Sequence, residues 1–245
     1  MSVTITLRTT ARVLHQIRHD RRTIALILLV PGLLLALLRY VFDSQPAVFD
    51  RVGLMMLGIF PMLSMFLVTS IAMLRERTSG TLERILTTPL HKLDLLLGYG
   101  IAFAVLAALQ AAIASAVAYW LLDLDTEGGL GAVMGIAIAS AVLGSAIGLF
   151  VSAFASTEFQ AVQFMPVVIA PQILLCGLIW PREEMAGWLE AISDVLPLTY
   201  AVDALLEVGA NPEPTDQMWF DVAIIVGATV VALLLGAATL RRRTN

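Results

Sequence analysis

Charged and turn-forming residues are concentrated at 75–98, where the chain reads RERTSGTLERILTTPLHKLDLLLG. Ser79 and Gly80 can begin a helix here, since both residue types occur at N-caps. Three aliphatic residues follow at helical spacing: Leu82, Ile85 and Leu86. Pro89 disfavours helix at the residue before it, so the pattern predicts an amphipathic helix of about nine residues.

Five charged side chains surround this predicted helix: Arg75, Glu76, Arg77, Glu83 and Arg84. Its apolar face could lie on a membrane surface. It could equally dock in a groove of a partner protein, where a short helix with charged flanks can transmit force. The residues by themselves leave both interpretations open.

Neutral polar side chains are the next candidates, because they interrupt long apolar stretches. They are Ser64, Thr69, Gln110, Ser140, Gln163 and Gln172. Such groups most often form hydrogen bonds between helices, each contributing about 0.6–2 kcal/mol. They could also form a weakly polar wall around an amphiphilic substrate, and we name four substrate-path candidates: Ser64, Thr69, Gln163 and Gln172. Gln163 and Gln172 stand out because Pro166 and Pro171 interrupt the same stretch.

Other familiar reactive motifs are absent from the sequence. The single cysteine, Cys176, excludes an internal disulfide and a multi-cysteine metal site. Gly98 and Gly100 do not form a phosphate loop, because no strand precedes them and no Gly-Lys-Ser/Thr follows. We therefore expect no metal and no cofactor in this chain, and any ATP site must belong to another chain.

The composition indicates which elements carry these residues. Of the 245 residues, 59% are apolar and 14% are charged, whereas soluble proteins have about 45–50% and 25%. Six apolar stretches are long enough to cross a bilayer as helices, at 23–42, 52–74, 99–121, 132–154, 160–180 and 220–240. None alternates as a β-barrel strand does, so the sequence predicts an all-α membrane protein.

Ionisable side chains are missing from the interior of the second to fifth stretches. Arg39 lies near the outer end of the first stretch, and Asp221 at the outer mouth of the sixth. An ionisable residue at mid-membrane costs at least about 2.5–3.5 kcal/mol and usually marks an ion path. Their absence argues against an ion-coupled carrier, an intramembrane protease and an intramembrane metal enzyme.

Basic residues predict the orientation. Twelve of the 15 Lys and Arg residues flank one side of the six spans, and three lie on the other side, at Arg39, Arg51 and Arg182. Both termini are therefore expected in the cytoplasm. The lead 1–22 has aliphatic positions on one face and Arg and His on another, which predicts an amphipathic helix at the membrane surface. A cleaved signal peptide is not expected, because the polar lead is long and no cleavage site follows at the right distance.

Two further patterns concern helix packing. Small residues recur every fourth position in the fourth span: Ser140, Gly144, Gly148 and Ser152. They allow close approach of another helix, which we expect in the same chain, with a second copy as the alternative. On the outer side, 181–219 has two apolar patterns that meet at Leu196 and Pro197, which predicts a pair of short helices, either a peripheral cap or a re-entrant hairpin.

The connector resembles that of ABC type-2 transporter permeases, the membrane subunits of bacterial ATP-binding-cassette exporters. The similarity is strongest to the daunorubicin-resistance and multidrug branch. The matching positions are Glu76, Arg77, Gly80, Thr81, Leu82, Glu83, Leu86, Thr88 and Pro89. The basic lead, the six spans and the stretch PLTYAVDAL at 197–205 are also similar to this family.

The resemblance implies domains at 1–22, an elbow helix, and at 23–245, a six-helix transmembrane domain. It implies that two permease copies pair, as a homodimer or with a paralogue, and that separate ATPase subunits supply ATP and Mg²⁺. The connector would be the coupling helix, with Arg75, Glu76, Arg77, Gly80, Leu82, Glu83, Arg84, Leu86 and Pro89 in that role. Glu83 and Arg84 are the expected contact residues, and the turn 155–159 would be a second contact.

The resemblance further implies an outer lid that includes Trp180, Trp188, Pro197 and Tyr200. The expected function is export of drug-like or lipid-like amphiphiles across the bacterial cytoplasmic membrane, with lipid but no nucleic acid as a further partner. The chain itself would not be an enzyme. The alternatives are a polysaccharide or glycolipid exporter, disfavoured by only 7% aromatic residues, and a non-transporting assembly scaffold.

Overall fold

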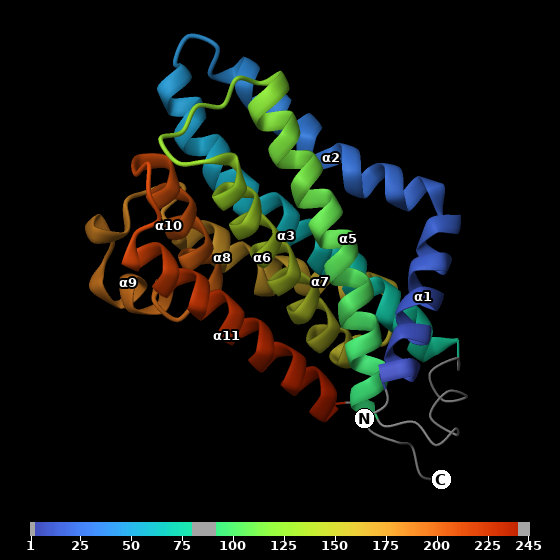
Figure 1. Cartoon of the computed structure of the whole chain (residues 1–245). Helices are drawn as coiled ribbons and strands as arrows, with labels where there is room; N and C mark the ends of the chain where they lie inside the picture. The colour runs from blue at the N-terminus through green and yellow to red at the C-terminus, as the bar shows by residue number, and fades with distance from the viewer. Residues whose placement is uncertain (1–2, 80–91, 240–245) are drawn as a thin grey trace.

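The computed structural model describes residues 3–79 and 92–239, in which every regular element is a helix (Figure 1). The elements are α1 (Val3–His19), α2 (Arg21–Val41), α3 (Pro46–Thr78), α5 (Lys92–Leu121), α6 (Leu130–Val151), η1 (Ser152–Phe154), α7 (Glu158–Val168), α8 (Ala170–Leu175), η2 (Arg182–Glu184), α9 (Gly187–Ser193), α10 (Pro197–Ala210) and α11 (Asp216–Thr239). Six helical segments are long and apolar enough to cross a membrane: Ile24–Val41, Pro46–Thr78, Leu97–Leu121, Leu130–Phe154, Glu158–Leu175 and Asp216–Thr239. The prediction of an all-helical chain with six candidate spans is confirmed for these residues.

The second span is part of a helix much longer than its apolar stretch. Helix α3 begins at Pro46, whose fixed φ suits the first helical position. It continues through the interior proline Pro61 and through the charged residues to Thr78. The stretch predicted at 52–74 covers only the apolar part of this helix, because a hydropathy pattern does not reveal helical residues that are charged.

The fifth span is interrupted. The stretch predicted at 160–180 contains two helices, α7 and α8, which meet at Ile169. Pro166 and Pro171 each lack the N–H that would donate to a carbonyl four residues back. Gly177, just after α8, has a left-handed φ of 88°, which glycine adopts without strain. Helix therefore ends before the apolar stretch does.

The centre of the molecule is the contact between α3 and α6. A Cβ atom on Gly144 would lie 2.2 Å from the Met62 carbonyl oxygen, and one on Gly148 would lie 2.6 Å from that of Phe66. Ser140 Oγ donates a hydrogen bond of 2.8 Å to the carbonyl of Gly58. The small residues of the fourth span thus serve a close contact within the chain, as predicted.

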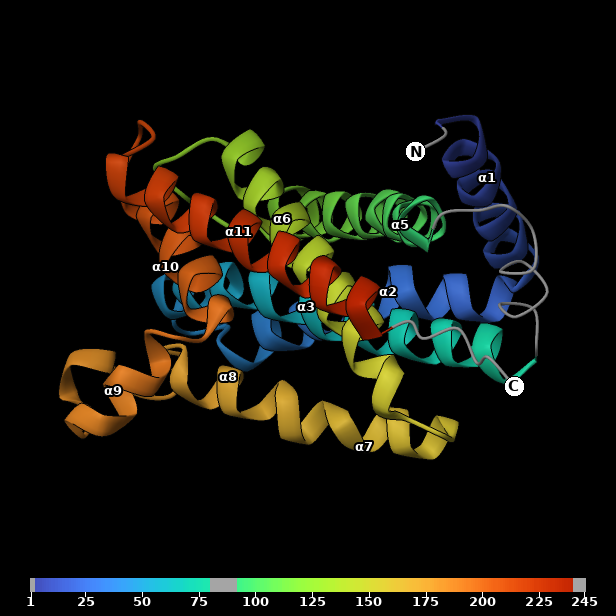
Figure 2. The same cartoon turned by 90° about the horizontal axis from the view of Figure 1, so that it is seen from below.

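The remaining helices surround this pair. Helix α5 packs against α6 on one side, α11 packs against α6 and α10, and α7 runs along α3 on the side away from α5 (Figure 2). Helices α9 and α10 lie at one end of the molecule. The start of α1, the last turn of α3 and the start of α5 lie at the other end (Figure 1), which we call the connector end.

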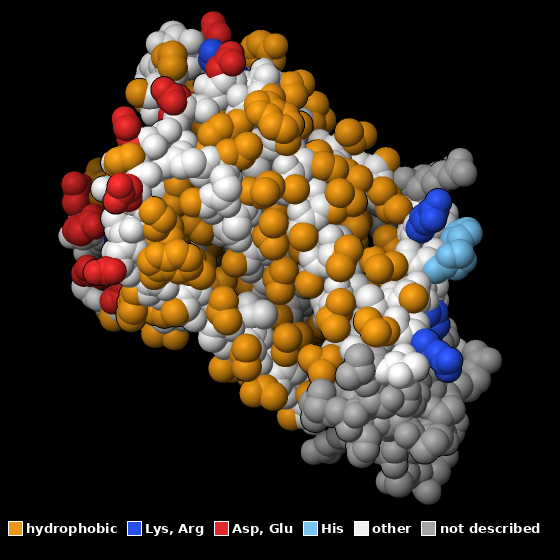
Figure 3. All heavy atoms as spheres, viewed as in Figure 1, with side chains coloured by type: hydrophobic (Ala, Val, Ile, Leu, Met, Phe, Trp, Pro, Cys, Tyr) orange, Lys and Arg blue, Asp and Glu red, His pale blue; other side chains and the backbone are white. Residues whose placement is uncertain are grey.

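The surface is divided along the same axis. Acidic side chains gather over the α9–α10 end, Arg and His side chains over α1, and hydrophobic side chains cover the face between them (Figure 3). This separation agrees with the charge asymmetry in the sequence.

Helix α1 packs through a face that differs from the aliphatic face in its sequence. Thr6, Thr9, Thr10 and Val13 are buried, whereas Leu7 is 58% exposed. Thr10 Oγ1 lies 3.1 Å from the carbonyl oxygen of Gly98, at the start of α5. Threonine hydroxyls can satisfy backbone acceptors while allowing close helix contact, so the three threonines are inside while Leu7 remains exposed.

Candidate functional site

Three consecutive residues at the end of α3 each contact a different part of the molecule. Arg75 forms an ion pair with Glu158 at the start of α7. Glu76 faces Arg12 of α1. Arg77 Nη1 donates a hydrogen bond of 2.6 Å to the carbonyl of Ser152, directly after α6. The residues that begin the connector therefore link α3 to α1, α6 and α7.

The contact between Arg75 and Glu158 has two parallel hydrogen bonds. Arg75 Nε donates to Glu158 Oε1 at 2.7 Å, and Nη2 donates to Oε2 at 3.0 Å. This fork geometry fixes the relative orientation of the two groups. Glu158 is itself held at the first turn of α7, because Thr157 Oγ1 caps the helix by accepting from the Gln160 N–H. The pair thus joins the ends of α3 and α7.

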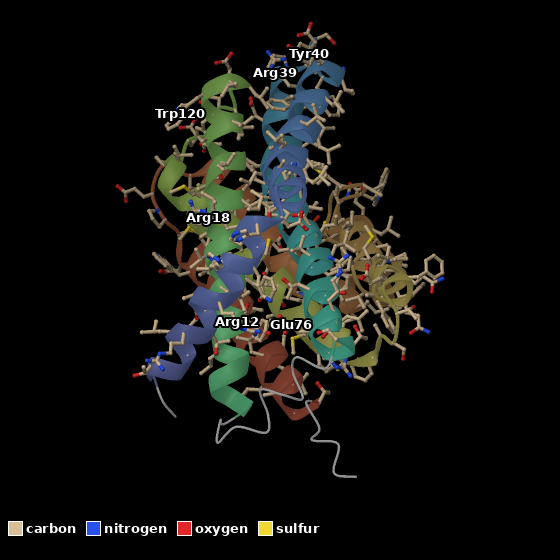
Figure 4. All side chains as sticks on the ribbon, turned by 90° about the vertical axis from the view of Figure 1, so that its right-hand side faces the viewer. Arg12, Arg18, Arg39, Tyr40, Glu76 and Trp120 are labelled. Carbon is tan, nitrogen blue, oxygen red and sulfur yellow. The ribbon has the colours of Figure 1, made fainter. Side chains whose placement is uncertain are left out.

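The contact between Glu76 and Arg12 is more enclosed. The Glu76 side chain is only 12% exposed, and its Oε2 lies 3.7 Å from Arg12 Nη1. Arg12 also donates to the Tyr99 hydroxyl, and its guanidinium lies 5.6 Å from the centre of the Tyr99 ring. Figure 4 shows Arg12 and Glu76 pointing toward each other from α1 and α3. A shielded carboxylate needs such a cation nearby, so α1 is held to α3 and α5 here.

The rest of the predicted coupling helix is not covered by the structure. Gly80, Leu82, Glu83, Arg84, Leu86 and Pro89 lie outside the described residues. Of the coupling candidates, Arg75, Glu76 and Arg77 are described, and they lie together at the connector end.

The four substrate-path candidates do not converge on one place. Ser64 Oγ is within 2.8 Å of the Phe60 carbonyl oxygen and accepts a hydrogen bond from Gln110 of α5. Thr69 is fully buried in α3. Gln163 is exposed on α7, whereas Gln172 is buried in α8. Of the four, only Gln163 is exposed.

Gln172 has a specific role in packing. Its Nε2 donates to the carbonyl of Val168 at 2.9 Å, and its Oε1 accepts from the N–H of Leu198 at 3.3 Å. One side chain therefore connects the end of α7, the first turns of α8 and the first turn of α10.

Helices α9 and α10 and the short helix η2 are joined by a second polar cluster. Arg182 forms ion pairs with Asp194 and with Asp203, the latter at 2.5 Å. Burial raises the pKa of the Asp203 carboxyl above its ordinary value, although Arg182 acts in the opposite direction. Ser193 Oγ donates to the carbonyl of Leu175 at 2.8 Å, which attaches α9 to α8.

The four lid candidates all lie in or near this region. Trp180 and Trp188 are 55% and 67% exposed. Pro197 is the first residue of α10, and the Tyr200 hydroxyl donates to the carbonyl of Asp194 at 2.6 Å. The two tryptophans are free to contact other molecules, whereas Pro197 and Tyr200 shape the turn between α9 and α10.

Comparison with known protein families identifies the family of this chain. The family profile for "ABC-2 type transporter" matches residues 6–208. This chain belongs to the ABC-2 type transporter family. With its six apolar helical segments, it is a multi-pass membrane protein.

Several known proteins resemble parts of this ABC-2 chain. It is 27% identical over 157 residues to the probable multidrug ABC transporter permease YbhR of Escherichia coli K12, covering 64% of this chain and 43% of the relative. It is 24% identical over 168 residues to the linearmycin resistance permease protein LnrN of Bacillus subtilis, covering 69% and 43%. For Nodulation protein J of Rhizobium leguminosarum bv. viciae the identity is 27% over 112 residues, covering 46% and 40%. Each aligned segment is less than half of the relative's length.

Sequence reasoning missed several partners of the site residues. Glu158 was expected only as part of a short turn, and its acidic character at the start of a helix was the available signal. Arg12 was expected only on the basic face of the lead and Tyr99 only at the start of a span, and Arg12 lies 64 positions before Glu76 along the chain. No group of three or more metal-binding side chains occurs in residues 3–79 and 92–239. Cys176 is buried there, and its thiol lies 3.3 Å from the Ile173 carbonyl oxygen.

Proposed function

We propose that this chain is the membrane subunit of an ABC exporter, which moves drug-like or lipid-like amphiphiles out of the cell. A separate subunit binds ATP and Mg²⁺ and hydrolyses the nucleotide, so the chain is not itself an enzyme. Family membership supports this assignment. The words "multidrug" and "linearmycin resistance" in two relatives' names support an amphiphilic substrate.

The observation that carries the proposal is the arrangement of Arg75, Glu76 and Arg77. A coupling element must pass force from a partner to several spans. These three residues attach the beginning of the connector to α7, to α1 and α5, and to the end of α6. A displacement of the connector would therefore reach most of the membrane domain and not α3 alone.

The other parts follow from the same proposal. The connector end faces the cytoplasm, α1 is the elbow helix, and α9 with α10 form the hairpin lid on the outer side. Two copies of the chain, or this chain and a paralogue, pair in the bacterial cytoplasmic membrane. The exposed apolar side chains of α7, among them Phe159 and Val167, offer a surface for lipid, substrate or the second copy.

Purification of the tagged chain in mild detergent tests the proposal. We expect a stoichiometric partner with a phosphate loop and with ATPase activity. The double substitution Glu83→Ala with Arg84→Ala should leave the chain folded and abolish the stimulation of that ATPase by the membrane subunit. Recovery of the chain alone, under conditions that preserve membrane complexes, would contradict the proposal and favour an assembly scaffold.

A further inference from the structure

The two helices of the fifth span are fastened at opposite ends to different parts of the molecule. At the connector end, Glu158 of α7 is paired with Arg75. At the outer end, α8 is attached to α9 and α10 through Ser193 and Gln172. Between these two attachments lies the junction at Ile169.

Helix α7 packs against the core less deeply than α3, α5 and α6, with Phe164, Met165 and Val168 only partly buried. Ala161 is its only buried residue in the structure described, and Phe159 and Val167 are each about 70% exposed. In Figure 2 the α7–α8 segment lies along the edge of the molecule, with α3 between it and α5. A helix with a shallow interface along its length and specific polar contacts at its ends can move as a unit when one end is displaced.

The junction between α7 and α8 is a place where the chain can bend. Pro166 and Pro171 both remove main-chain hydrogen bonds there. Gln172 Nε2 donates to the Val168 carbonyl beside this junction, and the same side chain accepts from the Leu198 N–H. The bend and the first turn of α10 are thus connected through one amide group.

The outer segment should follow α8 closely. Ser193 Oγ donates to Leu175, Thr199 Oγ1 donates to the Ser193 carbonyl at 2.9 Å, and Arg182 pairs with Asp194 and Asp203. These contacts join α8, η2, α9 and α10 into one body. Movement of α8 would therefore carry the outer helices with it.

We propose that Glu158 and Gln172 are positioning residues that link the end of α3 to the outer helices through α7 and α8. This inference rests on the proposed function, because the displacement begins at the connector. The Arg75–Glu158 pair is suited to positioning and not to stability. Its side chains are 60% and 54% exposed, and exposed pairs contribute little to folding.

A spin label on the outer helices tests this link. Val195, between α9 and α10, is 79% exposed and can be replaced by cysteine in a Cys176→Ala background. The protein is purified with its ATPase subunit and labelled. Label mobility is compared without nucleotide and with ATP and vanadate. We expect nucleotide to change the mobility in the otherwise unaltered protein.

Two substitutions should abolish this change while the ATPase subunit remains bound and continues to hydrolyse ATP. They are Glu158→Gln, which breaks the pair, and Gln172→Met, which keeps the side-chain length but removes both hydrogen bonds. Glu213→Gln and Gln16→Met are the matched controls at exposed positions and should retain the full change. The exchanged pair Arg75→Glu with Glu158→Arg should restore the change that Glu158→Gln loses.

The exchanged pair separates the proposed link from a direct contact of Glu158 with the ATPase. It keeps the ion pair within the chain but reverses the charge that position 158 presents to a partner, so a direct contact would not be restored. Retention of the change in both Glu158→Gln and Gln172→Met would overturn the inference. A nucleotide-insensitive label in the unaltered protein, with an active ATPase bound, would overturn it as well. A preparation without any ATPase subunit would instead contradict the proposed function, and the inference with it.

Discussion

Helices α6 and α7 both pack against α3, but they are held in opposite ways. Helix α6 has twelve buried residues among 22, whereas α7 has one, Ala161, among 11. Along α6, glycines bring two backbones into contact. Helix α7 has a shallower interface, in which Phe164 and Met165 are only partly buried, and it has polar contacts at its ends through Glu158 and the junction with α8. The contrast indicates a rigid α3–α6 pair beside a helix that can transmit movement.

The physical reason lies in how contacts are distributed. Dispersion contacts along a whole interface add up and cannot be exchanged without repacking. One bidentate ion pair and one amide side chain can keep their geometry while the helix between them tilts. The two helices thus suit different tasks, and each task can be disturbed separately.

The largest expected effect is at the α3–α6 contact. In Gly144→Ala, the new Cβ would lie 2.2 Å from the Met62 carbonyl oxygen, and relief requires moving backbone. We expect a loss of about 3 kcal/mol in the free energy of unfolding, measured by denaturant titration in detergent micelles. Gly135→Ala is the control in the same helix, since its Cβ would meet nothing within 4 Å. Equal destabilisation of both variants would show that α6 is not held by close backbone contact.

A smaller loss is expected where α1 attaches to the connector end. Arg12→Gln removes the cation beside the shielded Glu76 carboxylate, which should cost about 1–3 kcal/mol. Arg8→Gln changes an exposed arginine on the same helix and should cost less than about 0.5 kcal/mol. Limited proteolysis should cut within α1 faster in the first variant. The same cleavage rate in both would refute a role for Arg12 in holding α1.

Two serines of α6 sharpen the comparison within one helix. Ser140 Oγ bonds across to Gly58 of α3, whereas Ser145 Oγ bonds to Ala141 of its own helix. Ser140→Ala should therefore lose about 0.6 kcal/mol, and Ser145→Ala less. Thermal denaturation of both variants in one detergent measures the difference, and the reverse order would contradict the assigned packing.

A comparably small effect on stability is expected for the Arg75–Glu158 pair. Glu158→Gln should change the free energy of unfolding by less than about 1 kcal/mol, because both side chains are largely exposed. The same denaturant titration measures this value. A loss comparable to that of Gly144→Ala would mean that α7 is held as rigidly as α6.

The fold was largely predictable from local patterns. Span length, the small-residue spacing of α6 and the buried positions Leu198, Ala201, Val202 and Leu205 of α10 all follow from periodicity along one helix. Hydropathy also located six candidate spans. It did not locate helix ends, since α3 continues into charged sequence and the fifth span bends at Ile169.

The site was predictable only in part. The sequence pointed to Arg75, Glu76 and Arg77 but not to their partners, because Arg12, Ser152 and Glu158 are distant along the chain. The packing face of α1 was also hidden. Thr6, Thr9 and Thr10 read as polar surface by composition, yet their short side chains allow close approach to α5. Pairings between distant polar groups depend on tertiary geometry, which no local pattern encodes.

Two distances in the labelled ATPase complex test the central claim most directly. Spin labels at Gly135 and Arg51 report α6 against α3, and labels at Gly135 and Val167 report α6 against α7; all three positions are exposed. Pulsed electron paramagnetic resonance measures both distances without nucleotide and with ATP and vanadate. We predict that the α3–α6 distance is unchanged and that the α6–α7 distance shifts. If the two distances shift together, or if neither responds, the contrast between a rigid pair and a transmitting helix is wrong.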